Sequence, residues 1–267
     1  MFRLTRAVRF AVNSDPHEQQ RLLQGKPTNG HAGFPSLTGF GHFFTLECTI
    51  TGCLDARSKY LVNIKQIDAA VRDRAIPIMG SIVGQPGAAP ARVIALLFEQ
   101  LGDGWPAGVR LESLRLSLSP FLSVACNAWE LPMVRISQKF EFSATHRLHN
   151  PALSPQENRQ TFGKCNNPHG HGHNYEVQVA LSGVPDDTGM LIAVPRFEQI
   201  VAETVIDRFD HRNLNVELPE FQTLIPSVEN IAMTIYTLLK PRFEDERARL
   251  AAVTVWETPK TWCEYSE

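Results

Sequence analysis

An internal repeat constrains the fold of this chain more than any other feature of its sequence. The stretch Gly172–Gly183, Gly-His-Asn-Tyr-Glu-Val-Gln-Val-Ala-Leu-Ser-Gly, matches Gly41–Gly52, Gly-His-Phe-Phe-Thr-Leu-Glu-Cys-Thr-Ile-Thr-Gly, without a gap. In both stretches apolar residues recur at every second position, which is typical of a half-buried β-strand. We therefore predict that one α+β unit occurs twice, with strands in one layer and helices in the other. Two unrelated α+β halves are the alternative.

The elements around the two matching strands follow the same order in both halves. Alternating residues predict strands, and apolar residues spaced i, i+3, i+4 and i+7 predict amphipathic helices. A linker around residues 119–132 separates a first repeat, residues 1–122, from a second, residues 133–267. The predicted order is strand, strand, helix, helix, strand: residues 4–12, 41–52, 64–71, 93–101 and 114–118, then 136–144, 172–183, 197–205, 231–239 and 253–257.

Three histidines of the second repeat have the spacing of a metal site. His171 and His173 stand two apart at the start of a strand, so both side chains point to the same face. His146 ends the preceding predicted strand. Three neutral imidazoles with an open fourth position describe a catalytic zinc site. The alternative is a set of surface histidines in a glycine-rich turn.

The first repeat does not keep this set of histidines. Aligning the repeats leaves His42 as the only histidine at a matching position, and a lone imidazole binds a metal weakly. We therefore expect the first repeat to be a structural or assembly partner without a metal site. The other aligned pairs are Ser14 with His146, Phe40 with His171, Phe34 with Cys165, and Leu118 with Glu257.

Charge and cysteine content exclude several classes of protein. The formal net charge is −2, and the basic residues are scattered, so we expect no nucleic-acid partner. Five cysteines without a CxxC pair indicate a reducing compartment. No secretory signal and no apolar run of about 20 residues is present, so we predict a cytoplasmic protein with no membrane contact.

Residues from about 134 to 267 resemble the 6-pyruvoyltetrahydropterin synthase family, which includes the 6-carboxytetrahydropterin synthases of queuosine and other deazapurine biosynthesis. Several blocks in the right order make the resemblance specific. These are Phe142-Ser-Ala-Thr-His146-Arg-Leu, Phe162-Gly-Lys-Cys165-Asn-Asn-Pro, Gly170-His171-Gly-His173-Asn-Tyr, Thr188-Gly-Met190, Asp210-His211-Arg-Asn-Leu-Asn215, Glu229-Asn230 and Glu257-Thr258.

The resemblance implies a fold, an assembly and a substrate. Each repeat would be a tunnelling-fold unit, an antiparallel four-stranded sheet with two helices on one face. Such units pair their sheets to close a barrel, so the resemblance implies a homo-oligomer with sites where units meet. The substrate would be 7,8-dihydroneopterin triphosphate, from which a zinc-dependent lyase eliminates triphosphate.

The resemblance also assigns the central roles. His146, His171 and His173 would be the Zn²⁺ ligands, with substrate hydroxyls completing the coordination. Cys165 would be the general base, which requires its thiol pKa to fall, and Lys164, the zinc and the histidines could supply the positive potential. Asp210 would orient His211, whose imidazole shuttles protons. An inert buried thiol and a polar loop are the alternatives for Cys165 and Asp210.

The remaining roles concern the rest of the substrate. Glu257 would grip the pterin ring with two parallel hydrogen bonds. Ser227 and Glu229 are further candidates for substrate binding, although an N-cap and an acidic first helical turn explain both residues locally. The basic residues that could meet the triphosphate, or lie in an ordinary solvated loop, are Arg147, Arg159 and Lys164.

The product is less constrained than the reaction. Five residues separate Cys165 from His171, as in the branch that forms 6-pyruvoyltetrahydropterin, whereas the branch that forms 6-carboxytetrahydropterin usually has a shorter gap. We favour the 6-pyruvoyl product and keep the 6-carboxy product as the alternative. A pterin-binding protein without turnover is the alternative from another class.

Overall fold

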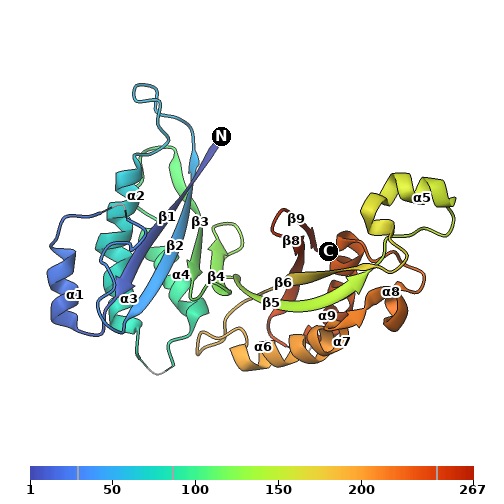
Figure 1. The fold of residues 1–267 in the computed structure, drawn as a ribbon. Helices are drawn as coiled ribbons and strands as arrows, with labels where there is room; N and C mark the ends of the chain where they lie inside the picture. Colours follow the sequence, from blue (N-terminus) through green and yellow to red (C-terminus); the bar gives the residue numbers. More distant parts are fainter. Residues whose placement is uncertain (29, 86, 245) are drawn as a thin grey trace. The chain divides into compact units, whose positions relative to one another are not determined.

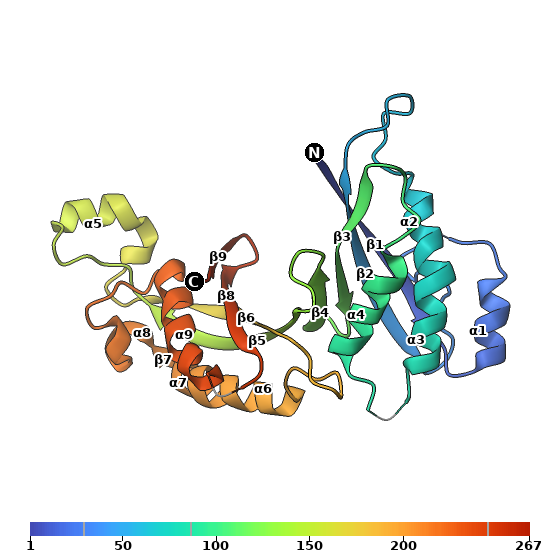
Figure 2. The ribbon, with the colours of Figure 1, turned by 180° about the vertical axis from the view of Figure 1, so that it is seen from behind.

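The computed structural model describes residues 1–28, 30–85, 87–244 and 246–267. The chain divides into two compact units (Figures 1 and 2). The first unit contains Met1–Ile136 and Gly183–Leu191, and the second contains Ser137–Ser182 and Ile192–Glu267. Each unit combines an antiparallel sheet with helices, as an α+β fold requires.

The first unit has a four-stranded antiparallel sheet in which the strands follow their order along the chain. Helices α2 and α3 pack on β1, and α4 packs on β3 and β4. The strands are β1 (Phe2–Val12), β2 (His42–Gly52), β3 (Val109–Ser117) and β4 (Leu122–Asn127), and the helices are α1 (Pro16–Leu23), α2 (Ile64–Ala70), α3 (Ile76–Ile82) and α4 (Pro90–Leu101).

Alternation along the strands builds the core of this unit. Every second residue near the middle of β1 and β2 is buried, and the helices close the core with their apolar stripes. This is the arrangement predicted from the repeating apolar positions. The buried residues include Val8, Phe10, Leu46, Cys48, Ile50, Ile67, Ile94 and Leu97.

The second unit has the strand order β5-β6-β8-β9, and the short strand β7 pairs in parallel with β5. Helix α9 packs on β8 and β9, and Figure 1 shows α6 and α9 on one side of the strands. The elements are β5 (Val134–His146), α5 (Pro155–Phe162), β6 (His171–Gly183), α6 (Val194–Val201), α7 (Asp207–Phe209), β7 (Arg212–Asn213), α8 (Leu214–Glu217), α9 (Val228–Leu239), β8 (Arg249–Thr258) and β9 (Thr261–Tyr265).

The two units share two backbone irregularities at aligned positions. The β2–β3 register shifts between Thr49 and Ile50, and the β6–β8 register shifts between Ala180 and Leu181. These pairs are equivalent in the alignment of Gly41–Gly52 with Gly172–Gly183. Extended without a gap, that alignment also superposes the π-helical turns Val71–Ala75 and Ala202–Ile206. Bulges and π-turns are uncommon features, so their coincidence reflects similar packing in both units.

Two further observations bear on the sequence predictions. All five cysteines are free thiols. None of the helices in the described ranges combines the length and the apolar character that a membrane crossing requires.

A partly buried ion pair joins strand β1 to helix α2 in the first unit. Arg6 donates from Nε and Nη2 to the two carboxylate oxygens of Asp68 at 2.8 and 2.9 Å, and Asp68 is 6% exposed. We expect Asp68→Asn to lower the free energy of unfolding by about 1–3 kcal/mol, because the charge-assisted bonds are lost. Denaturant unfolding measures the change. The exposed Asp73→Asn in the following turn is the control, and equal effects of the two variants would contradict the assignment.

Candidate metal centre

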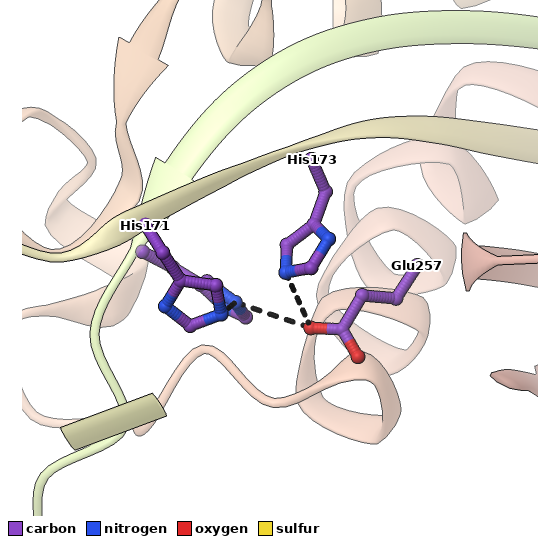
Figure 3. A group of neighbouring side chains, drawn as sticks. His171, His173 and Glu257 are labelled. Carbon is purple, nitrogen blue, oxygen red and sulfur yellow. Dashed lines mark hydrogen bonds and ion pairs between the residues drawn. The ribbon is translucent and has the colours of Figure 1, made fainter. Parts of the chain in front are cut away.

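Three imidazole rings meet where β5 ends and β6 begins. His146 is the last residue of β5, and His171 and His173 lie at the start of β6. Figure 3 shows His171 and His173 beside Glu257. The Nε2 atoms of His146 and His171 are 3.1 Å apart, and the ring centroid of His173 lies 5.2 and 4.8 Å from those of His146 and His171. The two-residue period of β6 directs its pair of histidines to one face, where they meet the ring from β5.

Glu257 joins the three rings from β8. Its Oε1 atom lies 3.1 Å from His146 Nε2 and 3.3 Å from His173 Nε2. One ligand atom from each of the four residues falls within 4.8 Å of all the others. The sequence analysis assigned Glu257 to the pterin ring and did not foresee its contact with the imidazoles. The contact arises because β8 pairs with β6, with Trp256 opposite Glu176.

A backbone carbonyl determines which nitrogen of His146 faces the group. His146 is fully buried, and its Nδ1 lies 2.7 Å from the carbonyl oxygen of Pro226. A carbonyl oxygen only accepts, so we assign the proton to Nδ1, and the neutral ring then directs the Nε2 lone pair at Glu257. Two acceptors 3.1 Å apart are stable only with a proton or a cation between them. Imidazole nitrogen, carboxylate oxygen and a carbonyl behind the ring fit a zinc site.

The surroundings favour the neutral form of His171 and His173 and the charged form of Glu257. Burial is the main cause of the lowered pKa of His171 and His173, and the opposing charge of Glu257 does not outweigh it. The pKa of the Glu257 carboxyl lies below its usual range, chiefly because of its contact with His146 and despite partial burial. A proton or a cation at His146 Nε2 would have that effect. Neutral imidazoles and an ionised carboxylate are the forms that bind metals.

Cys165 lies in the turn Gly163–Asn166 that follows α5, and its carbonyl accepts from Leu148 N at 2.9 Å. Its side chain is half-buried. The pKa of the thiol is raised, first by burial and then by the charge of Glu257. The protein side chains alone therefore do not produce the lowered thiol pKa that the sequence analysis expects of Cys165. A cation bound beside Glu257 would act in the opposite direction.

The sequence analysis missed Tyr175, which lies two residues beyond His173 on the same face. The residue is fully buried, and its ring centroid lies 5.5 Å from that of His173 and 6.0 Å from that of His146. Its phenol oxygen has no hydrogen-bond partner among the described residues. Burial, then Glu257 and Cys165, raise the phenol pKa. The thiol and the carboxylate therefore lie within electrostatic range of this ring.

The structure places Asp210 and His211 side by side. Asp210 accepts from Ser143 N at 2.8 Å through Oδ1 and lies 2.8 Å from His211 Nδ1 through Oδ2. His211 has a left-handed backbone with φ of 56°, and its N–H donates to the Ser143 carbonyl at 2.6 Å. The side chain of His211 is 84% exposed.

His211 lines a cavity that it shares with His173, one of the metal-ligand candidates, but not with Cys165. A cavity of about 740 Å³ is bounded by His211 and by Ser143, Thr145 and Asn174, which alternate with the buried residues of β5 and β6. Cys165 is not among its described lining residues. The second unit alone therefore does not unite the predicted base with the predicted proton shuttle.

Ser227 and Glu229 have the local roles that the sequence allows. Ser227 is the N-cap of α9, and its hydroxyl accepts from Asn230 N at 3.5 Å. Glu229 is exposed in the first turn, where a negative charge suits the helix dipole. Neither residue belongs to the group of metal-ligand candidates.

Comparisons with known proteins agree with the sequence motifs. The family model described as 6-pyruvoyl tetrahydropterin synthase matches residues 135–267. The 6-pyruvoyl tetrahydrobiopterin synthase of Drosophila melanogaster is 36% identical over 135 residues, which is 50% of this chain and 80% of the relative. The human protein of that name is 40% identical over 107 residues, 40% of this chain and 74% of the relative.

Two further matches extend the comparison. The 6-carboxy-5,6,7,8-tetrahydropterin synthase of Haemophilus influenzae is 29% identical over 156 residues, 51% of this chain and 100% of the relative. The solved structure of Caenorhabditis elegans 6-pyruvoyl tetrahydropterin synthase aligns with a TM-score of 0.49 and 39% identity, and covers 51% of this chain and 96% of that one.

The Asp210 contacts predict a pH dependence of stability. The Ser143 N–H, and then His211, lower the pKa of Asp210 below its ordinary value. The ionised carboxylate therefore stabilises the fold above the pKa of the unfolded chain, about 3.9, and this contribution is lost as the pH falls through the folded value. Asp210→Asn should destabilise the protein at pH 7 and approach the unchanged protein below pH ~4. Urea unfolding across this range measures it, with exposed Asp207→Asn as the control; a constant difference would contradict the assignment.

Proposed function

Because the chain belongs to the 6-pyruvoyl tetrahydropterin synthase family, we propose that its second unit is a zinc-dependent pterin synthase. Its substrate is 7,8-dihydroneopterin triphosphate, from which it eliminates triphosphate to give 6-pyruvoyltetrahydropterin. The observation that carries this proposal is the convergence of His146, His171 and His173 on one point. The relatives named 6-pyruvoyl tetrahydrobiopterin synthase support the choice of substrate class.

The three imidazoles hold the metal, and Pro226 presets His146 for the task. Bound Zn²⁺ supplies Lewis-acid polarisation of a substrate oxygen and so acidifies the neighbouring C–H. Glu257 approaches the same point from β8 and is the pterin anchor in this proposal. To grip two N–H groups of a pterin, its carboxylate turns away from His146 and His173. Its lowered pKa keeps it ionised for that contact.

Cys165 and the Asp210–His211 pair divide the proton transfers. Cys165 takes a proton from the substrate side chain as a thiolate, so its pKa falls when the metal centre is loaded. Asp210 holds the Nδ1 proton of His211 and leaves Nε2 free to accept or give a proton. Ser227 and Glu229 stay weaker candidates for substrate contacts, since both have local roles in α9.

Cys165 is missing from the described lining of the cavity that His211 and His173 share, which supports a site completed by another copy of the unit. An exposed imidazole held in a fixed orientation is suited to reach into a neighbouring chain. The strand order also ends at β1 and at β9, which offers two strands for pairing between chains. We therefore propose a homo-oligomer that closes a barrel in a reducing cytoplasm.

The aligned bulges and π-turns support a tandem duplication in which the first unit has lost the site. Ser14 and Phe40 take the positions of two ligands, and the Ser14 hydroxyl donates to the Phe40 carbonyl. Phe40 itself is fully exposed. The first unit thus has a structural or assembly role in this proposal.

The 6-carboxy product is the second candidate. The match to the Haemophilus influenzae relative over its full length favours it. The five residues between Cys165 and His171 and the higher identity to the 6-pyruvoyl relatives favour the first candidate. Mass spectrometry of the product decides between them. Bound pterin with no released triphosphate would instead indicate a binding protein.

Zinc content and turnover test the metal centre. We expect about one zinc per chain, loss of turnover after complete chelation, and recovery when zinc is returned. His173→Ala should weaken zinc binding by more than about tenfold, because a direct ligand contributes more than an outer-shell partner. The aligned His42→Ala in the first unit is the control and should leave the zinc content unchanged. Unchanged turnover without zinc would refute the proposal.

Removing the thiol tests the base. Cys165→Ala should lower kcat by about 10²–10⁴, the range of general base catalysis, and leave the zinc content intact. Exposed Cys53→Ala is the matched control. Full activity of Cys165→Ala would remove the thiol from the mechanism without affecting the metal assignment.

A further inference from the structure

We propose that a second cavity beside the metal centre, bordered by Arg147, His149 and His169, is the subsite for a polyphosphate chain. This inference rests on the proposed function, because the polyphosphate is that of the substrate. The cavity has a volume of about 540 Å³. It is hereafter called the basic cavity.

The basic cavity is built on the same backbone segments as the metal centre. Arg147 follows His146 directly, and Pro168–Gly170 immediately precedes His171. The lining also includes Ile225, which precedes Pro226, the residue whose carbonyl orients His146. The shared backbone places this cavity next to the metal centre, and the proposal is that a molecule held at the histidines extends its chain into it.

The hydrogen bonds inside the basic cavity leave N–H groups of Arg147 and His149 available as donors. Asn166 Nδ2 lies 3.1 Å and Arg147 Nη2 lies 3.3 Å from His149 Nδ1. An amide N–H and a guanidinium can only donate, so His149 Nδ1 accepts and the neutral ring carries its proton on Nε2. Arg147 Nε donates to the Asn166 carbonyl at 3.2 Å, which fixes the plane of the guanidinium. Its Nη1 atom has no partner among the described residues. A fixed guanidinium and a fixed imidazole N–H match phosphate oxygens.

Charge distinguishes this cavity from two other cavities of the second unit. No described residue that lines the basic cavity carries a carboxylate. The cavity at His211 includes Glu217, and a cavity of about 500 Å³ beside Trp256 includes Glu176 and Glu257. A triphosphate bears several negative charges at neutral pH, so carboxylates repel it and the basic cavity attracts it.

The structure distinguishes Arg147 from the two other basic residues that the sequence analysis considers for the triphosphate. Arg147 lines the basic cavity, whereas Arg159 and Lys164 are exposed and are not among its described lining residues. Arg159 therefore provides a matched control. It carries the same charge on the same stretch of chain, without the fixed geometry.

Calorimetry with inorganic tripolyphosphate tests the subsite on the zinc-loaded full chain. Arg147→Gln should weaken binding about tenfold or more, since charge-assisted hydrogen bonds are lost, and Arg159→Gln should bind like the unchanged protein. Arg147→Lys keeps the positive charge but loses the planar guanidinium, so its affinity for tripolyphosphate should lie between those of Arg147→Gln and the unchanged protein. Tripolyphosphate also binds zinc, so metal content is measured after each titration, and thermal unfolding checks that each variant is folded.

Unphosphorylated 7,8-dihydroneopterin separates this proposal from the proposed function. Its affinity should be equal in Arg147→Gln and the unchanged protein, whereas KM for the triphosphate should rise about tenfold with a smaller change in kcat. Equal tripolyphosphate binding by folded Arg147→Lys, Arg147→Gln and unchanged protein would overturn the subsite. Arg147-dependent binding of tripolyphosphate without any turnover of the pterin triphosphate would support the subsite and overturn the proposed function.

Discussion

The candidate site depends on a close approach between the end of β5 and the residue before β6. Gly170 has a left-handed φ of 74°, and a Cβ atom built there would lie 3.0 Å from the carbonyl oxygen of His146. A side chain would be strained at this φ and would push the two backbones apart. The contact brings the ring of His171 to that of His146. Gly170 and Arg147, the residue after His146, also line the basic cavity, so this close approach borders both sites.

Glu257 contributes to the electrostatics of the whole site. Burial is the main cause of the raised pKa of the Cys165 thiol and the Tyr175 phenol, and the charge of Glu257 raises both further. In the proposed function, a divalent cation at the histidines would offset the charge of Glu257 and would thereby couple metal binding to ionisation of the thiol.

Local patterns predicted the parts of the molecule that depend on neighbours in sequence. The two-residue period placed His171 and His173 on one face, and the helical spacing located α6 and α9. Contacts that depend on tertiary register lay beyond such patterns. The position of Glu257 depends on how β8 pairs with β6, and the role of Pro226 depends on a loop distant in sequence. The end strands β4 and β9 have too short an alternation to stand out. The pKa of Cys165 could not be predicted, because burial and Glu257 act only in the folded chain.

The partner that orients His146 has a consequence for how such a site changes over time. Pro226 contributes its main-chain oxygen and not its side chain. Every amino acid carries that oxygen, so no single replacement at this position deletes the acceptor. Only a detour of the loop, through an insertion or a deletion, moves it. A point substitution at Pro226 therefore leaves the tautomer of His146 unchanged, whereas an insertion or a deletion in this loop can change it.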